Sequence, residues 1–269
     1  MLENILICPK TKSRITIDAE NSIAKVEGSD LSYPIKAGII DFLPDTVDRV
    51  SKAYDSIAPS YDDYMNQSSL KWKLFTLLAW GSLDVKGWEA LTQKVLSSIP
   101  DDFDGVLLDV PVGTGTFTSN KYRKLKKARI IALDYSIGML KKAQHSYAEN
   151  GIENVTFIRG DVGSLPIDHA SLDLCLSMAG FHAFPDKARA LHEIVRVLKP
   201  GKIFSGYFYI KGGRLLTDLF IRHMGSRRGY FSPPFYDEQE SLSIFGEYFD
   251  IEYTATMQSF FAFAMKKKN

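Results

Sequence analysis

The stretch Val106-Leu-Leu-Asp109-Val-Pro-Val-Gly113-Thr-Gly115-Thr-Phe117 decides the fold that the sequence predicts. It begins as an apolar run, which suits a buried parallel strand. Gly113 and Gly115 then allow a sharp turn and a close approach of the backbone to a ligand, because neither carries a Cβ. Asp109, at the end of the strand, provides an acceptor facing that turn. A site of this kind, at the carboxyl end of a parallel strand, suits a nucleotide-like cofactor.

The spacing around the glycines argues against a dinucleotide. That fingerprint requires a third glycine three residues after the second, and position 118 is Thr. The pattern Asp109-x-x-x-Gly113-Thr-Gly115 instead resembles motif I of class I S-adenosylmethionine (SAM) dependent methyltransferases. Many members have Gly where this chain has Pro111. Proline fixes φ and lacks an N–H, so the turn should be stiffer and a backbone contact should be missing.

Two further acidic residues follow strands in the order that this resemblance requires. Asp134 ends the apolar run from Ile130 about twenty residues after the glycines, where a carboxylate can accept both ribose hydroxyls. Ser136 is a plausible N-cap for a helix over 139–150. The run from Val155 leads to Asp161 and Val162. The resemblance implies that the side chain of Asp161 binds the adenine amino group and that the backbone N–H of Val162 reaches the ring; an Asx-type turn at Asp161 is compatible with that role.

A fourth strand is predicted over 171–178, and its exit loop, 179–186, resembles the loop that faces the transferring methyl group in this family. His182 lies in this loop. It is either a base toward the acceptor or a residue that only shapes the pocket. The phrase around Glu193 and Arg196, which ends at Lys-Pro-Gly201, is typical of these enzymes and marks the fold. We expect those two side chains to form a solvated i,i+3 pair.

The segment before the core carries a second resemblance. Tyr54-Asp-x-x-Ala-x-x-Tyr61-Asp is similar to the segment that closes over the methionine end of SAM in ubiquinone/menaquinone-type methyltransferases. There the two tyrosine hydroxyls would reach a carboxylate; alternatively, both rings belong to the core. Residues 68–98 predict two helices with a break between Gly81 and Gly87. They either pack on the core, cover an apolar substrate or touch a membrane surface.

Residues 1–45 predict a small β-rich module. Ile7-Cys8-Pro9 and Tyr33-Pro-Ile-x-x-Gly38-Ile resemble the zinc-ribbon-like domain found before some ribosomal-RNA methyltransferases and in tRNA-methyltransferase activators. A structural zinc site needs about four ligands. Cys8 has no second Cys and no His nearby, so we expect no metal. Such a module would serve packing, partner docking or substrate recognition.

Composition narrows the class of protein. The chain has 269 residues, a formal net charge of +1 and two cysteines, Cys8 and Cys175. This charge gives no general attraction to nucleic acid or anionic membranes. The cysteines predict no disulfide framework, which favours a cytoplasmic location. We recognise no signal peptide, and the apolar stretch from Leu74 to Trp80 is too short to span a bilayer.

The alternating strands and helices predict an α/β fold in residues 101–269, preceded by a helical segment, 46–100, and the module. The resemblance implies that the sheet is Rossmann-like, mixed and seven-stranded. An insertion, 211–247, should lie over the acceptor pocket, where its aromatic and arginine side chains would grip a substrate or seal a lid. The expected function is methyl transfer from SAM, giving S-adenosylhomocysteine, to a small molecule. Alternatives are an RNA acceptor, a non-catalytic SAM-binding regulator and, disfavoured by Thr118, a nicotinamide oxidoreductase. The oligomeric state stays open. The expected cofactor-binding residues are Tyr54, Tyr61, Asp109, Pro111, Gly113, Gly115, Asp134, Tyr135, Asp161, Val162 and Met178.

Overall fold

The computed structural model describes residues 4–44, 49–60, 70–81 and 84–269. Its strands are β1 (Ile15–Asp18), β2 (Ile23–Val26), β3 (Ser32–Lys36), β4 (Ile39–Asp41), β5 (Val106–Asp109), β6 (Arg129–Asp134), β7 (Val155–Arg159), β8 (Leu172–Met178), β9 (Leu198–Tyr209), β10 (Phe249–Met257) and β11 (Phe260–Lys267). Its α-helices are α1 (Arg49–Ile57), α3 (Leu70–Trp80), α4 (Val85–Leu96), α5 (Ser119–Tyr122), α6 (Ile137–Glu149), α7 (Lys187–Val197), α8 (Leu215–Phe220), α9 (Ser226–Arg228) and α10 (Glu238–Gly246). Shorter helical turns are η2 (Ala58–Ser60), η3 (Val162–Ser164), η4 (Phe181–Ala183) and the π-helical η5 (Ile221–Gly225).

The core sheet has the strand order β7-β6-β5-β8-β9-β11-β10. Strands β7, β6, β5, β8 and β9 are parallel to one another. Strand β11 lies between β9 and β10 and pairs antiparallel with both. Every residue of β5 is buried, as expected for a strand covered on both faces. The predicted seven-stranded mixed α/β sheet is confirmed.

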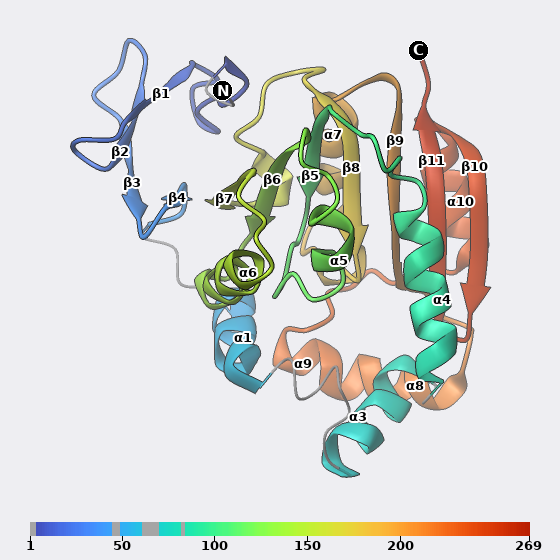
Figure 1. Ribbon diagram of the computed structural model, residues 1–269. Coiled ribbons are helices and arrows are strands. Elements are labelled where there is room, and N and C mark those ends of the chain that lie inside the picture. Colours follow the sequence, from blue (N-terminus) through green and yellow to red (C-terminus); the bar gives the residue numbers. More distant parts are fainter. Residues whose placement is uncertain (1–3, 45–48, 61–69, 82–83) are drawn as a thin grey trace.

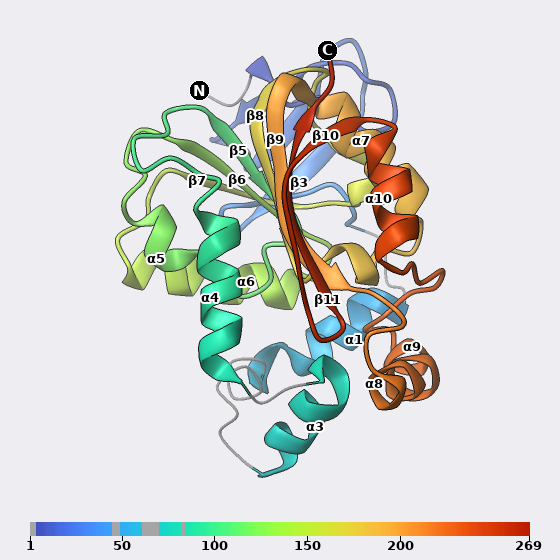
Figure 2. The same cartoon turned by 90° about the vertical axis from the view of Figure 1, so that its right-hand side faces the viewer.

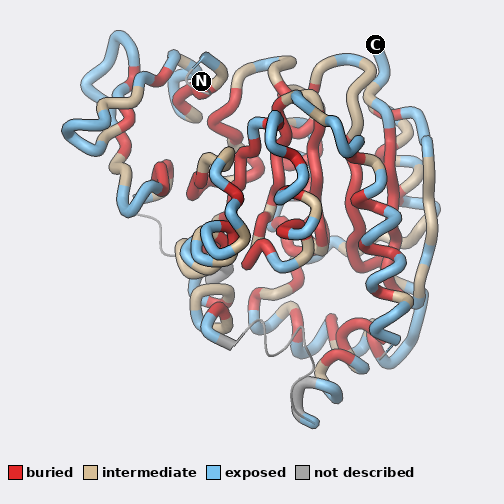
Figure 3. The backbone as a smooth tube through the Cα atoms, viewed as in Figure 1, coloured by how far each residue is buried: buried red, intermediate tan, exposed pale blue. Residues whose placement is uncertain are grey.

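Helices cover both faces of this sheet. Figure 2 shows α4, α5 and α6 on one face and α7 and α10 on the other. The apolar side chains of each face form a separate buried cluster. In Figure 3 the strands of the core sheet are largely buried, whereas the helices that cover them are partly exposed. Helices α1, α3, α8 and α9 gather instead beyond one end of the sheet (Figure 1). This is the end where the parallel strands finish, which is where ligands bind in open α/β sheets.

The N-terminal strands β1–β4 extend the core sheet. Strand β4 pairs in parallel with β7, so that Ile39 lies opposite Phe157, and the continuous sheet has 11 strands. At this junction the guanidinium of Arg159 lies 3.3 Å from the carboxylate of Asp41, and both side chains are buried. The module therefore covers what would otherwise be an exposed strand edge.

Cys8 is enclosed within the module. Its thiol lies 3.2 Å from the hydroxyl of Tyr33 and accepts a hydrogen bond from the backbone N–H of Thr11. Within the described ranges, no three His, Cys, Asp or Glu side chains stand together in a way that could hold a metal ion.

The helical segment breaks where the glycines predicted. Gly81 ends α3 with a positive φ of 76°, and Asp84 caps α4 by accepting from the N–H of Gly87. None of the described helices is both long and apolar enough to cross a membrane.

The expectation of a solvated Glu193–Arg196 pair was wrong. Arg196 donates to Glu193 at 2.6 Å and to the carbonyl of Ile167 at 2.8 Å, while Glu193 accepts from the N–H of Leu165. The pair is largely buried and fixes the loop after η3 to α7.

Candidate functional site

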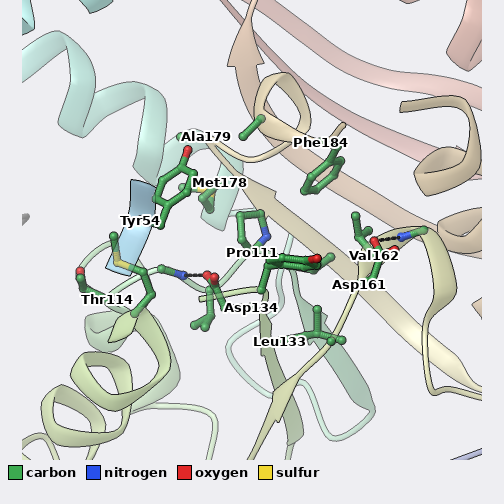
Figure 4. Close-up of a pocket in the computed structure, with 18 of the residues that line it drawn as sticks. Tyr54, Pro111, Thr114, Leu133, Asp134, Asp161, Val162, Met178, Ala179 and Phe184 are labelled. Carbon is green, nitrogen blue, oxygen red and sulfur yellow. Dashed lines mark hydrogen bonds between the residues drawn. The ribbon is translucent and has the colours of Figure 1, made fainter. Parts of the chain in front are cut away.

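A cavity of about 290 Å³ lies at the carboxyl ends of β5, β6, β7 and β8. Small-molecule sites start at roughly 300 Å³, so its size fits one elongated ligand. Tyr54, Met178 and Ala179 lie at one end and Asp161 and Val162 at the other (Figure 4). Its lining also includes residues 110–117, Leu133, Asp134, Tyr135, Met139, Gly160, Gly163 and residues 183–186, with Arg189.

The loop after β5 forms the floor of the cavity. Gly113 has a φ of 58°, and a Cβ added there would meet no atom within 4 Å. Because the residue lines the cavity, that Cβ would project into ligand space. At Gly115, by contrast, a Cβ would lie 2.4 Å from the ring of Tyr147. The first glycine leaves room for a ligand, and the second lets the loop pack on α6.

Asp109 does not line the cavity, contrary to its expected role as a ligand-facing acceptor. It is buried beneath the loop, where Oδ2 accepts from the hydroxyl of Tyr122 at 2.9 Å. Its other oxygen, Oδ1, is buried and meets no hydrogen-bond partner among the described residues. Burial raises the pKa of Asp109 to about 7, and the negative charge of Asp134 adds to this. The geometry gives Asp109 a supporting role under the glycine loop.

Asp134 lies at the centre of the cavity wall (Figure 4). Its Oδ2 accepts from the N–H of Gly113 and its Oδ1 from the N–H of Ser136, both at 2.9 Å. Ser136 caps α6, as predicted, by accepting from the N–H of Met139. A carboxylate can accept about four hydrogen bonds, so Asp134 has capacity left for ligand hydroxyls. Burial raises its pKa to about 6, against the lowering effect of the backbone N–H groups.

Asp161 and Val162 line the far end of the cavity, where the sequence placed an adenine site. Asp161 caps η3 by accepting from the N–H of Gly163 at 2.8 Å. The predicted Asx-type geometry is therefore present. Val162 is the first residue of η3 and is buried, so its position follows directly from that cap.

Tyr54 and Asp55 fix α1 over the opposite end. The Tyr54 hydroxyl donates to the carbonyl of Tyr230 at 3.1 Å; its contact with a cofactor carboxylate stays a prediction. Asp55 accepts from the hydroxyl of Ser136 at 2.5 Å and from the N–H of Gly138 at 2.9 Å, so it also caps α6. Tyr61, the second tyrosine of the phrase, lies outside the described residues.

A smaller cavity of about 50 Å³ adjoins the first, and Tyr54 and Ala179 line both. Its remaining lining is mostly aromatic and comprises Ile57, Phe75, Trp80, His182, Tyr230, Phe231 and Phe260. The backbone N–H of Ser232 donates to the carbonyl of His182, and the ammonium of Lys187 donates to the carbonyls of Phe184 and Ser232. These bonds hold the inserted segment against the loop after β8.

His182 lines this aromatic cavity. Its Nδ1 accepts from the N–H of Tyr209 at 3.0 Å, and its ring stacks on Phe231 with centroids 4.5 Å apart. Burial, reinforced by the charge of Lys187, lowers the pKa of His182 to about 3. The ring is therefore neutral at physiological pH, and its proton is assigned to Nε2 from the hydrogen bond at Nδ1.

The sequence analysis expected the loop 179–186 at the site but did not single out Phe184 or Asp186 within it, and it missed Arg189; all three line the cavity. Asp186 caps α7 by accepting from the N–H of Arg189. An Asp at the end of the loop 179–186, directly before a helix, is a typical N-cap and could have indicated this turn. The cavity lining contains three carboxylates (Asp134, Asp161 and Asp186) and one cationic side chain, that of Arg189. The cavity therefore favours a ligand that carries positive charge.

Comparisons with known proteins agree with this geometry. Residues 107–201 match the family model of a methyltransferase domain. A demethylmenaquinone methyltransferase of Lactiplantibacillus plantarum is 34% identical over 154 residues, which are 56% of this chain and 59% of that protein. An uncharacterized chloroplastic methyltransferase of Arabidopsis thaliana is 27% identical over 58% of this chain and 49% of its own. This chain thus spans about half the length of the curated relatives it matches. The similarity is thus to methyltransferases and is concentrated in the segment that forms the cavity.

Solved structures share the fold at lower identity. A chain from the complex between the Haloferax volcanii Trm112 methyltransferase activator and a methyltransferase superposes with a TM-score of 0.62 at 17% identity, over 80% of this chain and 98% of its own. A Bacillus halodurans methyltransferase structure gives 0.54 at 22% identity, over 61% and 71%. At these identities the likeness shows the fold alone.

Proposed function

We propose that this protein is a SAM-dependent methyltransferase that acts on a small acceptor with an apolar, planar ring. The proposal rests on one observation: two cavities with different linings adjoin each other. One is elongated and rich in carboxylates, and the other is small and aromatic. Tyr54 and Ala179 line both, so a cofactor in the first would present its methyl end to an acceptor in the second.

The residues of the larger cavity fit SAM. Asp134 offers free acceptor capacity to the two ribose hydroxyls, and Gly113 keeps open the space that a side chain would fill. Asp161 and the backbone of Val162 would hold the adenine. Met178 and residues 110–117 would surround the methionine part. The carboxylates complement the positive charge of the sulfonium.

When bound, SAM supplies a methyl group that is already activated for transfer. The chain must then position the acceptor atom in line with that group and exclude water. The aromatic side chains on α3, β11 and the inserted segment do both, because they give a planar ring flat apolar surfaces on which to pack.

The acceptor gains a methyl group and loses a proton, and His182 is poorly suited to take that proton. Its Nδ1 lone pair is engaged by the N–H of Tyr209, and burial makes the ring a weak base. We infer that His182 shapes the acceptor cavity and presents Nε2–H as a donor to an acceptor oxygen. The proton that the methyl acceptor loses would then pass to solvent or to a proton-accepting group of the protein.

The relatives suggest which acceptor to test first. Several are named demethylmenaquinone methyltransferases. A reduced demethylmenaquinone has an electron-rich planar ring, which fits the aromatic lining. Among the described residues, none before Tyr54 lines either cavity, so the N-terminal module would not contact an acceptor bound there.

Calorimetric titration with S-adenosylhomocysteine tests the cofactor site. We expect Asp134→Ala to weaken binding by at least about 30-fold, since two hydrogen bonds to an ionised group are lost. Asp250→Ala, at an exposed position on β10, is the matched control and should bind like the wild type. Equal binding by both variants would refute the assignment of Asp134. A radiolabelled methyl assay with reduced demethylmenaquinone then tests the acceptor.

A further inference from the structure

Exposed large apolar side chains are concentrated on one part of the molecule. Ten are exposed in the described residues, and eight lie on α3, the start of α4, α8 and η5. These eight are Leu70, Leu74, Leu77, Val85, Leu215, Leu216, Leu219 and Met224. Here they are called the leucine surface. Monomeric soluble proteins rarely expose such a group without a binding function.

Helix α3 has apolar residues on two opposite faces. Leu70, Leu74 and Leu77 recur at helical spacing on the exposed face, and Leu70 is 83% exposed. Ala79 and Trp80 on the other face are buried in the core. A surface helix of a soluble protein normally carries polar residues on the face away from the core. Since one face of α3 already contacts the core, the exposed face needs a second apolar environment.

Helix α8 repeats this arrangement beside α3. Leu215, Leu216 and Leu219 are exposed, whereas Thr217 of the same helix is buried, as is Ile221 at the start of η5. The two helices contact each other, and the rings of Phe75 and Phe220 meet edge to face with centroids 5.3 Å apart. Figures 1 and 2 both show α3 and α8 beyond the same end of the sheet. The exposed leucines of both helices therefore belong to one region of the surface.

Basic residues accompany these leucines. Residues 70–81 and 214–228 contain six basic residues (Lys71, Lys73, Arg214, Arg222, Arg227 and Arg228) and one acidic residue, Asp218, a formal charge of +5. The whole chain has a net charge of only +1, so the rest of it carries −4. Arg222, Arg227 and Arg228 are exposed. The segments that carry the leucines are thus net positive, as are residues 121–129, which contain six basic residues and no acidic one.

The leucine surface also adjoins the aromatic cavity. Phe75 on α3 lines that cavity together with Tyr230, which lies just after α9. A compound that reaches the cavity past these residues would come from whatever covers the leucines.

We propose that the leucine surface docks on the interface of an anionic lipid bilayer, from which an apolar acceptor would enter the aromatic cavity. The entry route rests on the proposed function; the docking itself does not. Leucines would enter the boundary between headgroups and acyl chains, and the arginines would contact anionic headgroups. A second copy of the chain is a poorer occupant, because pairing two such surfaces would bring the exposed Arg222, Arg227 and Arg228 of both copies together, and like charges repel.

Vesicle co-sedimentation tests the docking. The full-length protein should bind vesicles of phosphatidylcholine with about 30% phosphatidylglycerol and bind pure phosphatidylcholine vesicles at least about tenfold more weakly. Raising NaCl from about 0.05 to about 0.5 M should weaken binding to the anionic vesicles, because salt screens charge. The double variant L215E/L216E should lose at least about tenfold in partitioning. The matched control is Ile251→Glu, which alters an exposed apolar residue on β10 and should bind like the wild type.

Other outcomes would overturn the proposal. Absence of binding, equal binding to neutral vesicles, or an equal loss in the Ile251 variant would each do so. So would a leucine-dependent dimer, seen by light scattering, with no vesicle binding. S-Adenosylhomocysteine titration of L215E/L216E should match the wild type, which shows that the variant is folded. Because that titration does not depend on lipid, the cofactor assignment and the docking can fail separately.

Discussion

Two buried carboxylates lie under and beside the same glycine loop, and their surroundings give them different roles. Asp134 accepts two backbone N–H groups and faces the cavity, whereas Asp109 is buried beneath the loop and accepts from the hydroxyl of Tyr122. Burial raises the pKa of Asp109 to about 7 and that of Asp134 to about 6. A pattern of acidic residues before and after the glycines cannot distinguish them, because the difference comes from packing against Tyr122.

The stability of the protein should depend on the ionisation of Asp109. Its pKa is raised on folding, so its stabilising effect is fully present below about pH 4 and is lost as pH rises through about 7. Asp109→Asn should therefore gain stability relative to the wild type between those values, by at most about 1.4 kcal/mol per pH unit. Urea unfolding at pH 5 and pH 8 measures this difference. Asp250→Asn is the exposed control, and a pH-independent difference for Asp109→Asn would contradict the argument.

Substitution of His182 distinguishes its two possible roles, a general base and a residue that only shapes the pocket. General base catalysis contributes about 10²- to 10⁴-fold to the rate. Because Nδ1 of His182 already accepts from Tyr209 and its pKa is lowered to about 3, we expect His182→Gln to lose less than about tenfold in kcat. The pH profile of kcat should also be unchanged between pH 6 and 9. A loss beyond about 100-fold would identify His182 as a base.

At the scale of elements, α1 connects the cofactor cavity to the N-terminus of α6. Asp55 accepts from Ser136 and Gly138, and its charge adds to the effect of burial in raising the pKa of Asp134. The sequence phrase containing Tyr54 and Tyr61 drew attention to the tyrosines. In the structure Asp55, between them, makes the anchoring contacts.

Asp55→Asn should change the pH dependence of cofactor binding. S-Adenosylhomocysteine affinity should fall as pH drops below about 6, where Asp134 becomes protonated. Removing the charge of Asp55 lowers the pKa of Asp134, so the midpoint of that fall should move to lower pH. Titrations from pH 5 to 8 measure it, with Asp84→Asn, the cap of α4, as the control. An unchanged midpoint would show that the two carboxylates are not coupled.

Local patterns predicted most elements because their causes are local. The apolar runs at 106–109 and 130–134 became β5 and β6, and Ser136 caps α6. Contacts between distant segments escaped prediction. The pairing of β4 with β7 joins residues more than one hundred positions apart. The bond from Tyr209 to His182 depends on β9 lying beside η4. Neither contact leaves a periodic signal in the sequence.

The whole molecule protects its two sheet edges differently. Strand β10 ends one side and carries Asp250 and Glu252 at exposed positions, which discourages pairing with another chain. On the other side, β1–β4 cover the edge of β7. The module therefore stabilises the core sheet. Its contact with β7 is also linked to the cofactor cavity through a single side chain.

That link passes through Arg159. Its guanidinium pairs with Asp41, donates to the carbonyl of Leu43 at 2.9 Å, and donates to the carbonyl of Tyr135 at 3.3 Å. Tyr135 lines the cofactor cavity. One buried side chain thus joins the end of β4 to the segment that follows Asp134, so the position of the module should affect cofactor binding.

Asp41→Asn should therefore both destabilise the protein and weaken the cofactor site. It leaves a buried guanidinium without its counter-charge, which costs about 3 kcal/mol in the free energy of unfolding. It should also lower S-adenosylhomocysteine affinity, because Arg159 no longer holds Tyr135 firmly. Asp18→Asn is the control in the same module, since its partner Lys25 is 54% exposed and screening makes that pair weak. If both variants lost stability equally, or if only stability changed in Asp41→Asn, the module would be an edge cover with no influence on the site.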